Sequence, residues 1–157
     1  MTSNSFFSKL LILWAVSCTA VCFSQQLMTV AEPQKLSAKR GETIVHHLKA
    51  QLKDGYHANS NTPTDAYLIP LKLTWEPGLL EVVDIKYPAP KNEKYEFSEK
   101  PLSVVSGDIE IVTKFKPSAN ANLGPGYQTG KLRYQACNDK MCFPPKTVDV
   151  KLPVLIQ

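Results

Sequence analysis

Two cysteines near the carboxyl end of the chain carry the clearest potential for chemistry. Four residues separate Cys137 from Cys142, and Pro144 and Pro145 follow shortly after. A tight turn through 138–141 would bring the two Cα atoms within the roughly 4.4–6.8 Å that a disulfide spans. The prolines fix the next backbone segment as extended and remove two N–H donors. The spacing therefore predicts a disulfide on a stiff turn, where an accessible sulfur can exchange with an incoming thiolate.

Spacing alone leaves three interpretations of this pair open. As a structural bridge in a non-catalytic interaction domain, the six-residue ring would stabilise the fold by about 2 kcal/mol, against about 4–5 kcal/mol for a ring that closes most of a domain. As a redox pair, it would pass two electrons by thiol–disulfide exchange. As soft ligands, the two cysteines and Met141 could hold Cu(I), joined by the histidines of the chain. These histidines are His46, His47 and His57.

The amino-terminal segment has the pattern of an export signal. Residues 1–9 carry one lysine and no acid, and they lead into the apolar run 10–16, which is too short to span a bilayer. Cleavage after Ser24 would remove Cys18 and Cys22 and leave 25–157 as the mature domain, with no membrane span. Lipid anchoring at Cys18 is the alternative. We expect a periplasmic or secreted protein whose remaining cysteines meet an oxidising compartment.

Composition favours one globular domain. With 157 residues and 43% hydrophobic content, the chain is long enough to bury a core and too short for several domains. The formal charge of +4 comes from scattered basic residues, which argues against nucleic acid as a partner. We expect a monomer stabilised mainly by apolar burial.

Alternation of apolar and polar residues predicts strands rather than helices. In 43–52, for example, His46 and Leu48 share the core face and His47 points outward. Six or seven such strands fit an immunoglobulin-like antiparallel β-sandwich, with a small barrel as the alternative. The segments 88–101 and 117–130 lack strand character and are predicted to be long loops, where binding usually occurs. The predicted strands are 43–52, 66–75, 79–87, 108–116, 131–136 and 147–154.

The residues around the cysteines resemble a known family, the N-terminal periplasmic domain of the thiol:disulfide interchange protein DsbD. The similarity rests on Tyr-Gln-Ala-Cys at 134–137 and Cys-Phe-Pro-Pro at 142–145, with an upstream Gly-Tyr-His at 55–57 and Leu-Ile-Pro at 68–70. The best-known members have five residues between the cysteines, whereas this chain has four. In addition, His57 and Asn59 fall where those members have tyrosines.

The resemblance implies a module of protein-disulfide reductase type that needs no cofactor or metal. Its cysteines would receive electrons from a thioredoxin-like donor and pass them to thioredoxin-fold clients such as disulfide isomerases. By the motif match, Cys142 would form the mixed disulfide and Cys137 would resolve it. A loop at 94–99 would cap the pair with Tyr95 or Phe97. The residues expected to cap the cysteines or contact partners are Tyr56, His57, Tyr95, Phe97 and Phe143.

Overall fold

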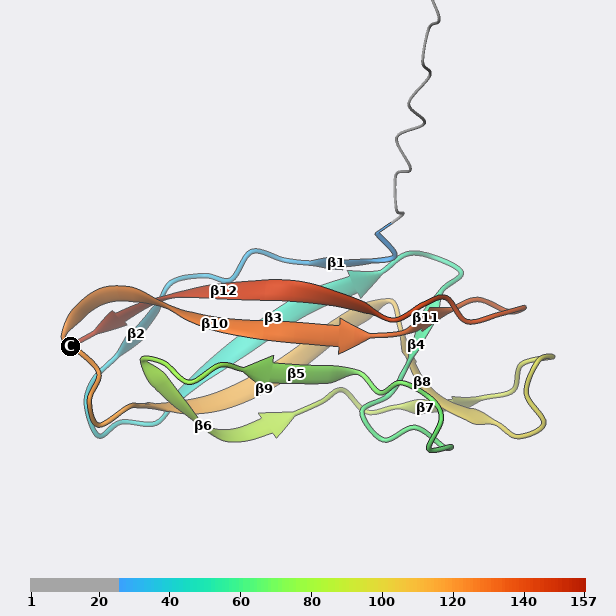
Figure 1. Cartoon of the computed structure of the whole chain (residues 1–157), viewed down its shortest axis with the longest axis horizontal. Helices are drawn as coiled ribbons and strands as arrows, with labels where there is room; N and C mark the ends of the chain where they lie inside the picture. Colours follow the sequence, from blue (N-terminus) through green and yellow to red (C-terminus); the bar gives the residue numbers. More distant parts are fainter. Residues whose placement is uncertain (1–25) are drawn as a thin grey trace, which may run out of the picture.

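The computed structural model describes residues 26–157, and all regular structure in that range is β-strand (Figure 1). The predicted signal peptide at 1–24, with Cys18, lies outside the described residues. Residues 26–157 contain no helix with the length and hydropathy needed to cross a membrane. In chain order the strands are β1 (Met28–Val30), β2 (Leu36–Ala38), β3 (Ile44–Leu52), β4 (His57–Asn59), β5 (Lys72–Trp75), β6 (Leu80–Lys86), β7 (Lys91–Glu93), β8 (Leu102–Ser106), β9 (Asp108–Pro117), β10 (Gly124–Tyr134), β11 (Ala136–Cys137) and β12 (Lys146–Ile156).

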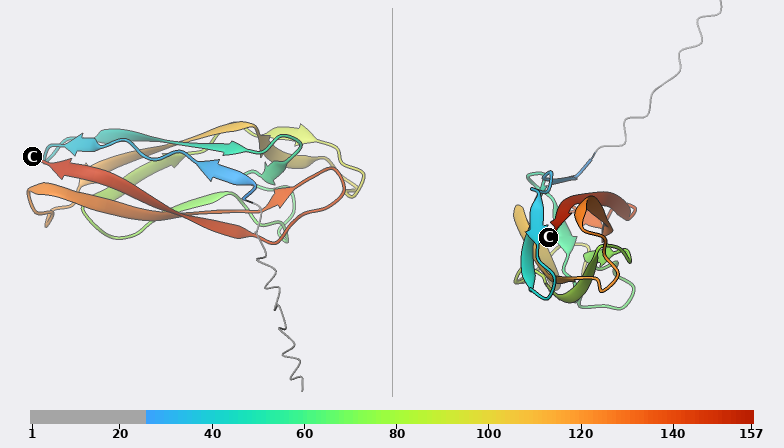
Figure 2. Two further views of the ribbon diagram at one scale, coloured as in Figure 1. Left: turned by 90° about the horizontal axis from the view of Figure 1, so that it is seen from above. Right: turned by 90° about the vertical axis from the view of Figure 1, so that its left-hand side faces the viewer.

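Two long sheets pack face to face (Figures 1 and 2). One has the strand order β1-β3-β9-β6 and the other β2-β12-β10-β5. Every pairing is antiparallel except that of β2 with β12. This arrangement confirms the predicted immunoglobulin-like sandwich rather than the barrel.

A third, smaller sheet lies at the end of the sandwich away from the carboxyl terminus (Figure 1). Its strand order is β11-β4-β8-β7, so it contains one of the two cysteines of interest. β11 follows β10 after a single residue, and β12 begins shortly after the second cysteine. The two long strands β10 and β12 therefore hold the cysteine segment between them.

The alternation of apolar and polar residues along the strands places the predicted apolar faces in the core. His46, Leu48, Ala50 and Leu52 of β3 are buried and the residues between them are exposed. The two sheets are joined through Trp75 of β5, whose indole Nε1 donates a hydrogen bond to Thr113 Oγ1 of β9 at 3.1 Å. The same ring packs edge-on against Phe115, with centroids 5.1 Å apart. Core residues on the other strands include Ile109, Ile111, Leu132, Tyr134, Val150, Leu152 and Val154.

The strand predictions were wrong for three segments, and the strands β1, β2, β4 and β8 were not predicted at all. The segment 117–130, predicted to be a loop, contains the first half of β10. Its glycines face large side chains, because a Cβ on Gly126 would lie 2.6 Å from Leu79 Cδ1 and one on Gly130 would lie 2.7 Å from Trp75 Cε3. Only the last four residues of the predicted strand 66–75 form a strand. The predicted loop 88–101 contains β7.

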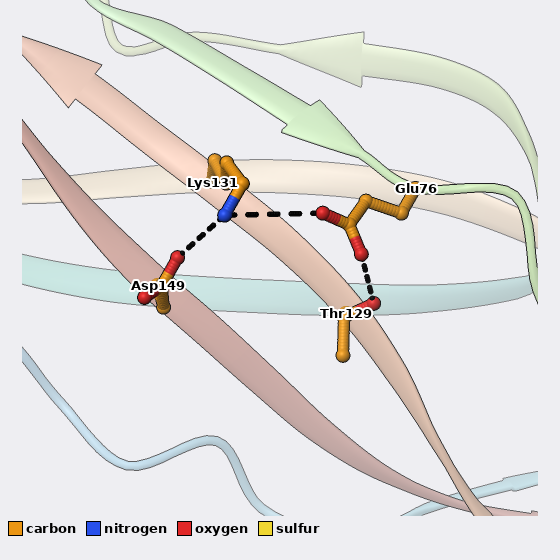
Figure 3. A network of polar contacts seen from close by, with 4 residues as sticks. All are labelled: Glu76, Thr129, Lys131 and Asp149. Atoms are coloured by element: carbon orange, nitrogen blue, oxygen red, sulfur yellow. Dashed lines mark hydrogen bonds and ion pairs between the residues drawn. The ribbon is translucent and has the colours of Figure 1, made fainter.

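A polar network crosses the outer face of the second sheet (Figure 3). Lys131 of β10 donates a hydrogen bond to Asp149 of β12 at 2.9 Å and lies 3.9 Å from a carboxylate oxygen of Glu76, which follows β5. Thr129 also donates a hydrogen bond to Glu76. The bond to Asp149 is the main cause of the raised pKa of Lys131. These groups are exposed, so they align three strands without contributing much stability.

Candidate functional site

The cysteine pair lies at the tip of the sandwich. Cys137 and Cys142 form the predicted disulfide and face each other across an antiparallel bridge. Their Cα atoms are 3.9 Å apart, slightly closer than the range that we predicted from the spacing. Beyond the pair, the Phe143 N–H donates to the Ala136 carbonyl at 2.8 Å, so the bridge continues the ladder of the two segments.

Asn138 shapes the turn between the cysteines. Its backbone N–H donates to the Met141 carbonyl at 2.9 Å. Its side-chain Oδ1 accepts hydrogen bonds from the N–H groups of Lys140, at 3.0 Å, and Met141, at 2.9 Å. An asparagine that bonds to the backbone two and three residues ahead favours a tight turn. The turn is therefore held by its own hydrogen bonds as well as by the disulfide.

The two cysteines differ in exposure. Cys137 is fully buried, whereas Cys142 is partly exposed. Cys142 also lines a surface hollow of about 250 Å³, together with Phe97, Tyr67 and Gln135. A larger hollow of about 540 Å³ runs along β1, β3 and β9, and neither cysteine lines it. Thiol–disulfide exchange requires access to the attacked sulfur, and of the two cysteines only Cys142 is partly exposed.

Three side-chain rings, those of His57, Tyr95 and Phe97, stack in a row from β4 to the loop 94–99. The ring of Tyr95 lies 4.0 Å from that of His57, with 15° between the planes, and Phe97 stacks on Tyr95 at 5.6 Å. Lys94 closes the loop that carries Tyr95 and Phe97, because its ammonium group donates to the carbonyls of Ser98 and Glu99. The stack connects the loop 94–99 to β4 and brings Phe97 to the hollow beside Cys142.

Tyr95 is fixed by a second contact. Its hydroxyl donates a hydrogen bond to Glu93 Oε2 at 2.6 Å. Burial and this hydrogen bond raise the pKa of Tyr95 well above its ordinary value, so the hydroxyl remains a donor at neutral pH. The structure thus places Phe97 at the hollow that Cys142 lines, and Tyr95 against His57, the strand partner of Cys137. Their capping role remains a prediction.

Tyr56 and Phe143 form a separate ring pair. Their centroids are 5.8 Å apart and their planes are tilted by 52°. Both are partly buried and pack against the main core. Phe143 directly follows Cys142, so this contact anchors the partly exposed cysteine to the segment that precedes β4. A role for these two rings in partner binding also remains a prediction.

Gln135 and Asn59 were not among the predicted site residues, yet they connect the segments of the site. Gln135 Nε2 donates to the Phe143 carbonyl at 3.1 Å. Gln135 Oε1 accepts from Asn59 Nδ2 at 3.3 Å and from the Ile69 N–H at 3.4 Å. Gln135 lies in one of the motifs that carry the family resemblance, whereas Asn59 is one of the two departures from it, and those positions were the available signal.

The histidines do not gather into one site. His57 of β4 is paired directly with Cys137 of β11. His46 lies in the core, 5.9 Å from the Trp75 ring, and His47 on the outer face pairs with Glu110 at 3.2 Å. Across residues 26–157, no three His, Cys, Asp or Glu side chains form a group suited to a metal ion.

The sequence of this chain matches the model of a known protein family. The family model described as the N-terminal part of thiol:disulfide interchange protein DsbD matches residues 24–153. Among solved structures, the reduced DsbD N-terminal domain of Neisseria meningitidis shares 17% identity at a TM-score of 0.46, over 68% of this chain and 74% of that one. The fimbrial subunit AggA of Escherichia coli shares 8% identity at a TM-score of 0.43, over 83% and 93% of the two chains. No curated protein matched the sequence. Because the family model covers most of its length, the chain belongs to the DsbD N-terminal domain family, whose members are periplasmic modules of thiol–disulfide exchange.

Proposed function

We propose that this protein is an exported module that relays two electrons through Cys137 and Cys142 between thioredoxin-fold partners, as a component of protein-disulfide reductase type. The family interacts with thioredoxin-fold proteins. One observation carries the specific role: the disulfide combines a fully buried cysteine with one that lines a surface hollow. Such asymmetry favours attack at a single sulfur, which a directional relay requires.

Electrons enter the pair from a reduced donor. A donor thiolate attacks the Cys142 sulfur, the bond to Cys137 breaks, and Cys137 leaves as a thiolate that takes up a proton. The second donor thiolate then attacks the donor sulfur of the mixed disulfide and expels Cys142 as a thiolate. The donor leaves as a disulfide, and the module holds two thiol groups.

Electrons leave by the reverse sequence. The Cys142 thiolate attacks a client disulfide and releases one client thiolate. Cys137 loses its proton and attacks the Cys142 sulfur, which expels the second client thiolate and restores the disulfide. The client gains two electrons and two protons overall, and no bound cofactor takes part.

A purely structural role is disfavoured by the position of the bridge. It closes a ring of six residues at the tip of the molecule, and Asn138 already holds the same turn. In the chain-entropy model such a ring contributes about 2 kcal/mol. The bridge therefore adds little to a fold that has its own extensive core.

Trapping of mixed disulfides tests the relay. In Cys137→Ser, an adduct formed at Cys142 cannot be resolved, so we expect covalent complexes with thioredoxin-fold proteins on non-reducing gels. Cys142→Ser is the matched control and should trap none, because Cys137 is buried. Equal trapping by both variants, or none by either, contradicts the proposed roles.

We also propose that export removes residues 1–24 and leaves the domain 25–157. The motivation is the basic start and apolar run described above. Intact-mass analysis of the exported protein tests this, with an amino terminus at Gln25 as the expected result. A lipid-modified amino terminus at Cys18 would contradict it and support the lipoprotein alternative.

A further inference from the structure

His57 occupies the position directly opposite Cys137. The two residues are paired across β4 and β11, so their side chains extend on the same face of the small sheet. Cβ atoms of residues paired in this way lie about 4.5–5.5 Å apart. Both residues are buried, with His57 only 4% exposed. The imidazole therefore lies beside the sulfur that solvent reaches least.

The imidazole has unused hydrogen-bonding capacity. Among the described residues, His57 Nε2 is a buried atom with no hydrogen-bond partner. Tyr95 covers one face of the ring at 4.0 Å and makes its own hydrogen bond elsewhere, to Glu93. Burying a polar atom without a partner is costly. Opening of the disulfide would create a thiol at Cys137 that can supply this partner.

The charges around His57 suit a group that takes up a proton and then releases it. Burial lowers the pKa of His57, so the ring is neutral at neutral pH and can accept a proton. Two carboxylates oppose this effect and favour the protonated ring: Glu93 at the end of β7 and Asp139 in the turn after β11. From β8, the residue paired with His57 is Ser106, which carries no charge.

We propose that His57 accepts the proton of the Cys137 thiol in the step that resolves the mixed disulfide at Cys142. The S–H bond of Cys137 breaks and its proton passes to the imidazole. The Cys137 thiolate attacks the Cys142 sulfur, the bond to the partner sulfur breaks, and the partner leaves as a thiolate with the electron pair. The imidazolium then returns its proton to solvent. This inference rests on the proposed relay and assigns its proton acceptor.

Rapid mixing of the reduced protein with dithiobis(nitrobenzoate) tests the step. Cys142 attacks the reagent and releases the first thionitrobenzoate, and Cys137 then displaces the second at a rate that does not depend on reagent concentration. In His57→Phe, which keeps a ring for Tyr95 to stack on, we expect the second release to slow about 100-fold at neutral pH. The first release should keep its rate.

The pH profile separates proton acceptance from packing. In the unmodified protein the second release should level off near neutral pH, since His57 is already neutral there. In His57→Phe and His57→Tyr its rate should keep rising with pH until the Cys137 thiol itself ionises. His47→Gln, which changes an exposed histidine on β3, is the matched control and should behave like the parent.

Two outcomes overturn the inference, and a third points elsewhere. A second release that slows less than about threefold in His57→Phe, against the 100-fold expected of a general base, removes the role of His57. A parent protein whose second release shows no plateau does the same without any variant. A parent that releases no thionitrobenzoate at all contradicts the relay itself, so failure of the two proposals can be distinguished.

Discussion

At the scale of single residues, the site depends on a contrast between two chemically identical side chains. Cys137 is enclosed by β4 and its neighbours, and Cys142 faces the surface hollow. The side chain of Gln135 supports this arrangement. It donates a hydrogen bond to the Phe143 carbonyl, just after Cys142, and accepts one from the Ile69 N–H in the segment that leads to β5. The position of Cys142 therefore depends on an amide that has no part in the exchange chemistry.

Replacement of Gln135 by leucine tests this dependence. The variant keeps most of the side-chain volume but leaves the Phe143 carbonyl and the Asn59 amide without this partner. We expect the free energy of unfolding to fall by about 1–3 kcal/mol. Urea unfolding measures it, with Gln51→Leu on the exposed face of β3 as a control. A loss no larger than that of the control would show that Gln135 does not hold the site.

The sequence could identify the cysteines but not these supporting amides. Cysteine spacing and the following prolines are local features, and they predicted the disulfide. Gln135 and Asn59 act through bonds between segments that are distant in sequence, such as the contact of Gln135 with Ile69. A single sequence does not show which of its polar residues will meet after folding.

At the scale of elements, the loop 94–99 lies beside the disulfide, and its predicted role is to limit access to Cys142. Its rings stack on β4 through His57, and its outermost ring, Phe97, lines the same hollow as Cys142. Phe97 is 39% exposed, so an approaching partner can contact it before reaching the sulfur. The stack therefore connects this exposed ring to His57, the strand partner of Cys137.

Removal of the Phe97 ring should make the disulfide more accessible to a small thiol. In Phe97→Ala, we expect reduction of the disulfide by dithiothreitol to accelerate about 3- to 10-fold, in line with the roughly 0.5–1.5 kcal/mol of an aromatic pair. The rate can be followed by quenching and mass analysis of the free thiols. Tyr127→Ala, which removes an exposed ring from β10, should leave the rate unchanged. An unchanged rate in Phe97→Ala would show that the loop does not shield Cys142.

Strand prediction succeeded where one face of a strand meets solvent. β3 and β9 alternate between buried and exposed residues almost throughout, and the sequence shows that period. β8 was missed because Leu102, Ser103, Val104 and Val105 are all buried, so the strand has no polar face. The start of β10 was missed because its glycines serve the packing of Leu79 and Trp75 and look like turn residues in sequence.

At the scale of the whole molecule, two buried histidines connect stability to pH. His46 lies in the core of the sandwich and His57 at its tip, and burial is the main cause of the lowered pKa of each. The unfolded chain therefore binds protons more readily than the folded protein below the ordinary histidine pKa of 6.5. Above that pH both states are neutral, so the stabilising effect of the neutral rings is complete.

We expect the free energy of unfolding to be steady above pH 6.5 and to fall as the pH decreases through the lowered pKa values of His46 and His57. Urea unfolding at several pH values between about 5 and 7.5 measures this, above the range where most carboxylates titrate. His46→Leu should flatten the dependence, and the neighbouring His47→Leu should not, because His47 is exposed. A rise in stability on acidification would contradict the assignment of both rings as buried and neutral.

The central claim is that the disulfide between Cys137 and Cys142 exchanges electrons, and its equilibrium redox potential tests that claim most directly. The purified protein is equilibrated with thiol buffers of known potential and with a thioredoxin-like domain, and the fraction of open disulfide is measured. We predict a potential above about −300 mV and full exchange with the thioredoxin-like domain. A potential far below that value, with no exchange, would show a purely structural bridge and contradict the relay.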